Sequence, residues 1–159
     1  MEHNVRVLPP EILAECLPEL LEDTQAVPLI ISGSSMSPFL VHGRDTVYLS
    51  KVVSPLKRGD MIFYRRDSGT YVLHRICGVE GETYSLVGDG QSVIERGIRR
   101  EQVLAIVTAV IRKGKLLKKG CFWWDFFEKV WMRLIPERRL AVRLYSFFKS
   151  GHNGENAHD

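Results

Sequence analysis

Short runs of β-branched and aromatic residues follow one another between residues 27 and 111, and they constrain the fold more than any other feature of the chain. Turn-forming stretches such as HGRD, RDSG, EGE and GDG separate the runs. This pattern is typical of short antiparallel strands joined by tight connections. The runs are VPLIIS, DTVYLS, MIFYRR, TYVLHRICGV, TYSLVG and VLAIVTAVI. We therefore expect a mainly β domain of the α+β type, built on a small antiparallel sheet or barrel.

Amphipathic helices are expected on both sides of this β region. In the preceding stretch, EILAECLPELLED, apolar residues recur at helical spacing, and Pro18 is expected to kink or divide the helix. The predicted apolar face consists of Ile12, Leu13, Cys16, Leu20 and Leu21. After the β region, a basic hinge, RKGKLLKKG, leads to two predicted helices, CFWWDFFEKVWMRLI and ERRLAVRLYSFFKS, which are separated by Pro136.

The chain of 159 residues is long enough for one domain with appendages. We expect a helical segment at 1–26, a β domain at 27–111, the basic hinge with its helical pair at 112–150, and a tail at 151–159. The net charge of +3 hides an asymmetry, because residues 112–149 contain 11 Lys or Arg against 3 Asp or Glu, a local charge of +8. The positive charge therefore belongs to the C-terminal region.

Cysteine usage and hydropathy indicate the compartment. Cys16, Cys77 and Cys121 are odd in number and irregularly spaced, which suits neither a disulfide framework nor a zinc site. The first residues lack the basic and apolar regions of a signal peptide, and no apolar run approaches the roughly 18 residues of a membrane span. We expect a protein on the cytoplasmic side, without a transmembrane helix or a signal peptide.

A turn rich in small residues, Ser32-Gly33-Ser34-Ser35-Met36-Ser37-Pro38, directly follows the run VPLII. Such a turn at a strand end can present a side chain outward with backbone N–H groups beside it. This is the geometry that a nucleophile and an oxyanion hole require. Taken alone, however, a Ser-rich turn is more often only a turn.

Side chains alternate along TYVLHRICGV, and His74 is predicted on the same face as Val72 and Ile76. The opposite face is predicted to present Tyr71, Leu73, Arg75 and Cys77. Apolar neighbours favour the neutral imidazole, which is the form that accepts a serine proton. The alternative is a core histidine that is hydrogen-bonded to a backbone carbonyl.

Two carboxylates follow this run. Asp89 lies between glycines in Val87-Gly88-Asp89-Gly90-Gln91, and Glu95 comes shortly after. A carboxylate bonded to the far nitrogen of an imidazole fixes its tautomer and stabilises the imidazolium. An aspartate between glycines is equally common in a turn without catalytic function.

Four motifs in order, SGSSMSP, GDMIFYR, LHRICGV and LVGDGQ, resemble the signal peptidase I and LexA-like superfamily of serine peptidases. The resemblance covers roughly residues 28–111. In this superfamily the serine before methionine in an SM-x-P box is the nucleophile, and most bacterial members have lysine where this chain has His74. The HRI triplet instead resembles the histidine-type branch, the ER and archaeal signal peptidases.

The resemblance implies a small antiparallel β-sheet or barrel-like catalytic domain and a serine endopeptidase that cleaves a leader or signal-like peptide. Carried over by position, Ser35 is the nucleophile, His74 the general base and Asp89 the orienting acid. The second acid of the histidine-type branch falls at Glu95, where the family has aspartate. Either acid is a candidate for the third catalytic residue.

The resemblance also implies an oxyanion hole that includes the backbone N–H of Ser35. Some relatives have a serine hydroxyl where this chain has Gly33, which leaves Ser34 and Ser37 as alternative side-chain donors. We expect a peptide or protein precursor as the partner, and neither a metal nor an organic cofactor. The oligomeric state stays open.

The basic, aromatic helices at 121–149 could lie on an anionic membrane surface or form a layer on the β domain or on a partner subunit. Their aromatic content argues against nucleic acid as the ligand. Two other functions remain. One is a peptide-binding or membrane-docking module without turnover, and the other is a self-cleaving LexA-like regulator, for which about 25 residues before the first strand are too few for a DNA-binding domain.

Overall fold

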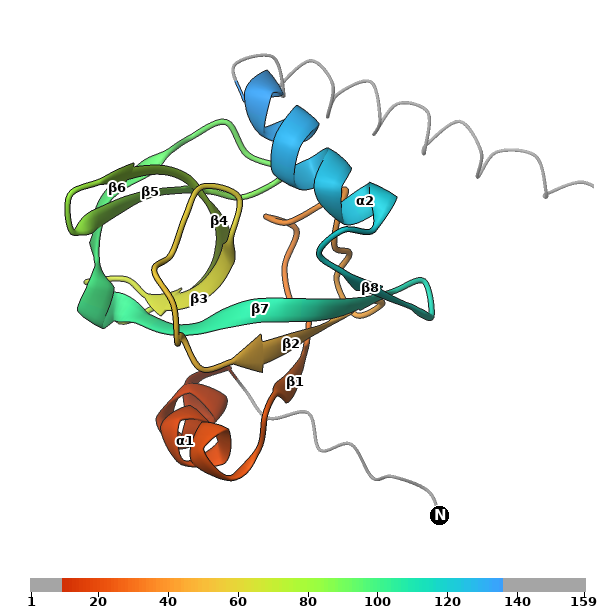
Figure 1. Cartoon of the computed structure of the whole chain (residues 1–159). Helices are drawn as coiled ribbons and strands as arrows, with labels where there is room; N and C mark the ends of the chain where they lie inside the picture. Colours follow the sequence, from red (N-terminus) through yellow and green to blue (C-terminus); the bar gives the residue numbers. More distant parts are fainter. Residues whose placement is uncertain (1–9, 136–159) are drawn as a thin grey trace, which may run out of the picture.

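The fold is an antiparallel sheet with one helix before it and a short helical segment after it (Figure 1). It is taken from a computed structural model that describes residues 10–135. The strands are β1 (Val27–Ile30), β2 (Thr46–Ser50), β3 (Met61–Arg65), β4 (Tyr71–Glu80), β5 (Thr83–Val87), β6 (Glu95–Arg99), β7 (Val103–Arg112) and β8 (Lys115–Lys118). The helices are α1 (Pro10–Asp23), η1 (Arg100–Gln102), α2 (Phe122–Asp125), η2 (Phe126–Val130) and η3 (Trp131–Leu134). The expectation of a mainly β domain is confirmed.

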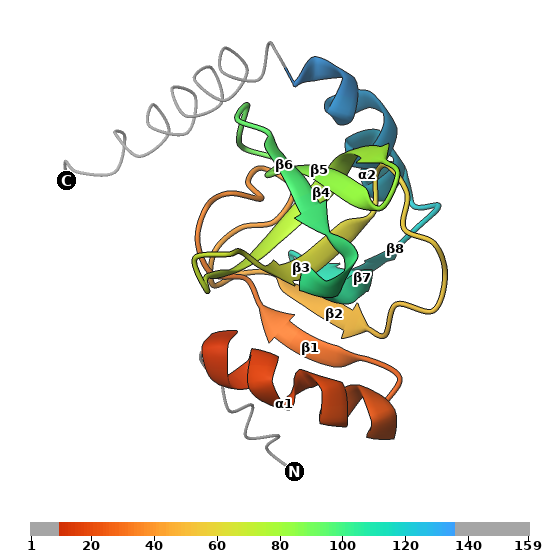
Figure 2. The same ribbon diagram turned by 90° about the vertical axis from the view of Figure 1, so that its left-hand side faces the viewer.

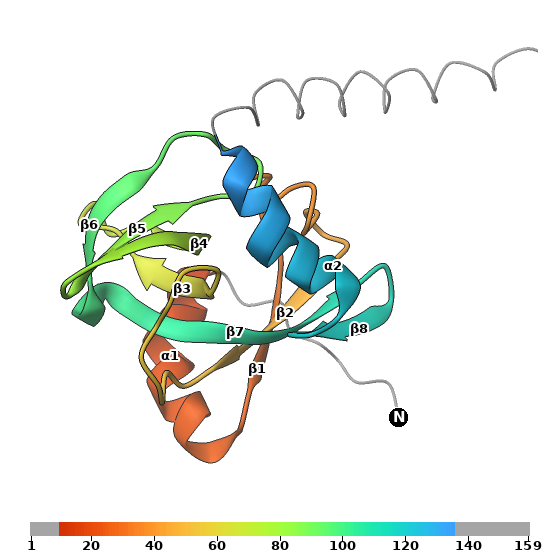
Figure 3. The ribbon, with the colours of Figure 1, turned by 45° about the horizontal axis from the view of Figure 1, so that its top comes forward.

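Within the described part of the chain the sheet has eight strands, in the order β1-β2-β7-β3-β4-β5-β6, with β8 paired to β7. Every pairing is antiparallel. Strands β3 to β6 curl toward one another (Figures 1 and 3). The concave side buries an inner cluster of Leu56, Ile62, Tyr64, Ile76, Tyr84, Leu86, Ile98 and Val103. The other face packs an outer cluster, which includes residues of β1, β2, β3 and β7, against α1 and the C-terminal helical segment.

Helix α1 lies beside β1 and covers one end of the outer cluster (Figure 2). It buries Leu13, Ala14, Leu17 and Leu21. Pro18 does not divide the helix, because one helix runs from Pro10 to Asp23. Pro18 lies on the exposed side, so the hydrogen bond that its missing N–H would make is lost where water reaches the backbone. The predicted face was also displaced, since Ile12 and Cys16 are exposed.

The basic stretch after β7 is a hairpin rather than a hinge. Strand β8 pairs with β7, with Arg112 opposite Lys115, so that Lys113 and Gly114 form a two-residue turn. Both turn residues have positive φ, at 50° and 75°. This conformation matches the twist of two-residue hairpins and is favoured by glycine. The hairpin extends the sheet to residue 118.

The first of the two predicted C-terminal helices is present as three consecutive helical segments. Segment α2 is an α-helix, η2 is a π-helix and η3 is a 3-10 helix. Together they bury Trp124, Phe127 and Met132. The rings of Trp124 and Phe127 lie 6.2 and 4.8 Å from that of Phe39, in the loop after β1. The second predicted helix, after Pro136, and the tail lie outside the described residues. No helix in residues 10–135 is long and apolar enough to cross a membrane.

A fully buried ion pair joins β4 to the loop after β5. Arg75 Nε and Nη2 donate to Asp89 Oδ1 and Oδ2 at 3.0 and 2.9 Å, and Arg75 Nη1 donates to the carbonyl of Gly59 at 2.9 Å. Both side chains are completely shielded from solvent. The Arg75 guanidinium also lies 5.4 Å from the ring centroid of Phe39. The pair therefore connects three loops that are distant in sequence.

Replacing Asp89 with Asn is expected to lower the free energy of unfolding by about 3 kcal/mol or more, because it leaves a buried guanidinium without its counter-charge. The matched control is Asp67→Asn, which breaks the exposed pair between Asp67 and Arg99 and should leave stability close to wild type. Urea unfolding measures both. Equal effects of the two substitutions would show that the buried pair does not stabilise the fold in this way.

Candidate active site

The loop from Ile31 to Asp45 presents Ser35 and is tied at its base by the backbone. Ile31 N donates to the Asp45 carbonyl at 2.9 Å, and Gly43 N donates to the Ile31 carbonyl at 2.8 Å. The buried carboxylate of Asp45 accepts hydrogen bonds from the N–H groups of Val41 and Lys113 at 2.9 and 3.2 Å. The small-residue turn is therefore part of a closed loop anchored to the sheet and to the β7–β8 hairpin.

The Gly88-Asp89-Gly90 turn packs its backbone directly against the loop that carries Ser35. Gly90 N donates to the Ser35 carbonyl at 2.8 Å. A Cβ at Gly90 would lie 2.6 Å from the carbonyl of Ser37, and a Cβ at Gly88 would overlap the carbonyl of Ser35. Glycine is needed at both positions because two backbones approach too closely for a side chain.

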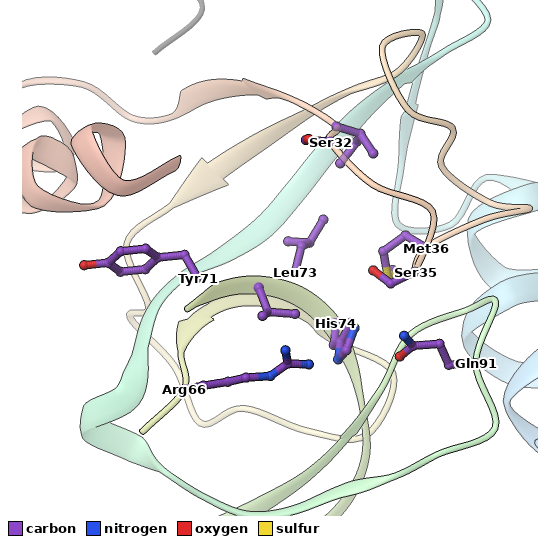
Figure 4. A pocket seen from close by; sticks show the side chains of 10 residues that line it. Ser32, Ser35, Met36, Arg66, Tyr71, Leu73, His74 and Gln91 are labelled. Carbon is purple, nitrogen blue, oxygen red and sulfur yellow. The ribbon is translucent and has the colours of Figure 1, made fainter. Parts of the chain in front are cut away.

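A cavity of about 250 Å³ opens between this loop and β4. Ser35 and Met36 lie on the loop side, while Leu73 and His74 approach from β4 (Figure 4). The remaining residues around the cavity are Ile31, Ser32, Arg66, Tyr71, Val72 and Gln91. The structure thus brings the predicted nucleophile and the predicted base to one cavity.

His74 is only 1% exposed and lies opposite Ile62 of β3. Burial lowers its pKa from 6.5 to about 4, against the opposing effect of the nearby Glu95 charge. The imidazole is therefore neutral at pH 7. Its Nε2 atom is buried and makes no hydrogen bond to any described residue, whereas most buried polar side-chain atoms have at least one partner.

The other imidazole nitrogen faces two oxygen atoms. His74 Nδ1 lies 3.3 Å from Glu95 Oε1 and 3.3 Å from the hydroxyl of Tyr64. Glu95 is also hydrogen-bonded by Tyr64 and Arg66. Although burial raises the pKa of Glu95, the hydrogen bonds from Arg66 and Tyr64 hold it below the ordinary value. Glu95 is therefore a carboxylate beside the imidazole.

The two candidate acids have different partners. The Asp89 carboxylate is bonded to Arg75, whereas the Glu95 carboxylate lies next to His74. The physical reason is the alternation along β4, which directs His74 and Arg75 to opposite faces of the sheet. In the structure it is therefore the carboxylate of Glu95, and not that of Asp89, that lies beside the His74 imidazole.

Tyr64 and Arg66 were not among the residues singled out from the sequence. Tyr64 follows Ile62, the cross-strand partner of His74, by two positions and so lies on the same face of β3, and Arg66 comes directly after the end of this strand. The alternation of side chains in MIFYRR can be read from the sequence. Only the pairing of β3 with β4 shows that Tyr64 comes close to His74. Of the serines considered as side-chain donors, neither Ser34 nor Ser37 lines the cavity, although Ser32 does.

Among residues 10–135, no three His, Cys, Asp or Glu side chains are grouped in a way that could hold a metal ion. Comparison with known proteins adds no assignment, since no family model, no curated protein and no solved structure matches the chain. The function has to be inferred from the geometry of the cavity and from the sequence motifs that line it.

The buried neutral histidine should make stability depend on pH. Between pH 6.5 and about pH 4 the unfolded chain binds a proton at His74 that the folded protein does not, so stability falls as the pH falls. We expect a loss of about 2 kcal/mol between pH 7 and pH 5, and no contribution from His74 above pH 7.

Urea unfolding of the wild type and of His74→Gln at both pH values measures this contribution. The glutamine variant should lose most of the pH dependence, because it has no proton to gain. An unchanged dependence in the variant would mean that other groups cause it.

Proposed function

We propose that the protein is a serine endopeptidase of the signal-peptidase type, in which Ser35 is the nucleophile, His74 the general base and Glu95 the acid that supports it. The observation that carries the proposal is the shared cavity of Ser35 and a neutral histidine whose Nε2 makes no hydrogen bond within residues 10–135. A nucleophile beside a base that is in turn oriented by a third group is the common arrangement for covalent catalysis.

The chemistry follows from these positions. His74 Nε2 takes the proton of the Ser35 hydroxyl as Oγ attacks the carbonyl carbon of the scissile peptide bond. The imidazolium formed is stabilised by the Glu95 carboxylate and passes its proton to the leaving amine, whose C–N bond breaks. Water then hydrolyses the acyl-enzyme, with His74 again as base, and the Ser35 hydroxyl is restored.

Two strand edges next to the cavity suit an extended peptide. Strand β1 pairs only with β2 among the described strands, and β4 pairs with β5 only from Arg75 onward. The cavity lies between the end of β1 and the unpaired side of residues 71–74. A peptide that adds to a sheet edge gains backbone hydrogen bonds without strict sequence requirements. We therefore propose a leader or signal-like peptide segment in extended conformation as the substrate.

The peptidase proposal can be tested with a mixed synthetic peptide library read by mass spectrometry. The wild type is expected to cleave a subset of the peptides, and Ser35→Ala and His74→Ala should reduce the rate by at least about 1,000-fold. Ser68→Ala, in an exposed turn before β4, is the matched control and should retain wild-type activity. Cleavage that persists in both active-site variants would refute the assignment.

A second candidate is a peptide-binding module without turnover. It is favoured by one observation, namely that Ser35 is not hydrogen-bonded to His74 in the structure. Catalytic hydrogen bonds are often loose before substrate binds, so this observation does not decide against catalysis. If the wild type and Ser35→Ala bind the same library peptides equally and neither cleaves them, the binding function is correct.

We also propose that the protein reaches its substrate at an anionic membrane surface. Phe122 and Trp123 are 73% and 46% exposed and lie in contact with each other at the start of α2. Lys113, Lys115 and Lys118 are exposed on the adjoining β7–β8 hairpin. Aromatic rings beside clustered lysines are suited to the interface of an anionic bilayer, where the rings enter the headgroup region and the lysines attract the lipid charge.

Co-sedimentation with phosphatidylserine-containing vesicles tests this surface. The double variant Phe122→Ser/Trp123→Ser is expected to bind at least about 10-fold more weakly, because two apolar rings no longer enter the interface. Binding of the wild type should also decrease with salt. Val53→Ser, which removes another highly exposed apolar side chain, is the control. Equal loss in the control, or wild-type binding to neutral phosphatidylcholine vesicles alone, would contradict the proposal.

A further inference from the structure

The hydroxyl of Tyr64 lies between the histidine and the carboxylate of the candidate active site. It donates to Glu95 Oε2 at 2.9 Å and is 3.3 Å from His74 Nδ1. The tyrosine side chain is fully buried in the inner cluster and does not line the cavity. Its phenolic oxygen therefore has these neighbours without contact to a bound peptide.

The direction of each hydrogen bond follows from the number of protons available. A tyrosine hydroxyl has one proton, and the shorter, charge-assisted bond to Glu95 takes it. Burial and the hydrogen bond to Glu95 both raise the pKa of Tyr64, so the proton stays on the phenol. Toward His74 the phenolic oxygen can then only accept, which requires a proton on Nδ1.

The position of Glu95 also indicates that the proton of the imidazole is on His74 Nδ1. Its Oε1 atom is 3.3 Å from His74 Nδ1, and an ionised carboxylate can only accept. Arg66 holds this carboxylate through two nitrogen atoms, one of them Nε at 2.8 Å from Oε2. Because both neighbours of Nδ1 are acceptors, the proton is fixed on Nδ1 and the lone pair is left on Nε2.

We propose that Tyr64 is a positioning residue for the base, linking His74 to the Glu95–Arg66 pair and holding the imidazole in the tautomer whose Nε2 can accept a proton. This inference rests on the proposed peptidase function and deepens it. At 3.3 Å the direct contact between carboxylate and imidazole is longer than an ordinary charge-assisted hydrogen bond of about 2.8 Å. The phenolic oxygen, which is also 3.3 Å from Nδ1, provides a second acceptor for the same proton.

The test is Tyr64→Phe, which removes the hydroxyl and keeps the ring. Tyr84→Phe is the matched control, because Tyr84 belongs to the same inner cluster and has no hydrogen bond to His74 or Glu95 among the described residues. Imidazole nitrogen NMR at pH 7, with the His74 signals assigned through His74→Gln, reports the tautomer without any substrate. We expect a single Nδ1-protonated tautomer in the wild type and in Tyr84→Phe, and a mixture in Tyr64→Phe.

Peptide cleavage gives a second readout. In Tyr64→Phe kcat should fall about 10-fold or more, in line with the loss of the hydrogen-bond partners that orient other functional histidines, and KM should not change because the tyrosine does not line the cavity. An Nε2-protonated wild type, or a Tyr64→Phe variant with the wild-type tautomer, would overturn the proposal. If Tyr64→Phe does not fold, as judged by circular dichroism, Glu95→Gln is measured by the same tautomer criterion.

The peptidase function and the positioning role of Tyr64 are distinguished by different measurements. A wild type that cleaves no peptide refutes the peptidase function, while the tautomer measurement still decides whether Tyr64 orients His74.

Discussion

The buried ion pair of Arg75 and Asp89 is the interaction on which the arrangement of the site depends. It fixes Asp89 in the loop after β5. The following residue, Gly90, donates a hydrogen bond to the carbonyl of Ser35. It also binds the carbonyl of Gly59, at the turn before β3. A charged pair without access to water needs all of its hydrogen bonds to be stable. The pair therefore holds the Gly88-Asp89-Gly90 turn beside the loop that carries Ser35 and connects it to the turn before β3.

Local patterns in the sequence were sufficient for much of the fold. The six predicted runs all form strands, because β-branched and aromatic residues bounded by turn-forming stretches favour extended structure. Strands β6 and β8 were missed, since ERGIR and KLLK contain few buried side chains and owe their conformation to backbone pairing with β5 and β7. Backbone pairing of this kind leaves no hydrophobic periodicity in the sequence of the strand that it holds.

The residues of the candidate site also differ in whether the sequence alone could identify them. Ser35 and His74 were found because each has a local signature, and the structure brings both to one cavity. The choice between Asp89 and Glu95 was not available from the sequence, because it depends on which face of β4 each carboxylate meets. Tyr64 was equally hidden, as its relation to His74 exists only through the register of β3 and β4. The peptidase assignment remains a proposal that this geometry supports.

The indole of Trp131 donates a hydrogen bond of 2.7 Å to the carbonyl of Asp89, while Phe127 packs on Phe39 in the serine loop. The smallest stretch of chain that preserves the cavity therefore extends well beyond the last of the peptidase-like motifs. A fragment that ends with β7 would retain every motif residue. It would lose the contacts of Trp131 with the loop after β5 and of Phe127 with the loop that carries Ser35. For this protein the extent of the chain that supports the cavity is set by packing, and it reaches Trp131, beyond the end of β7 at Arg112.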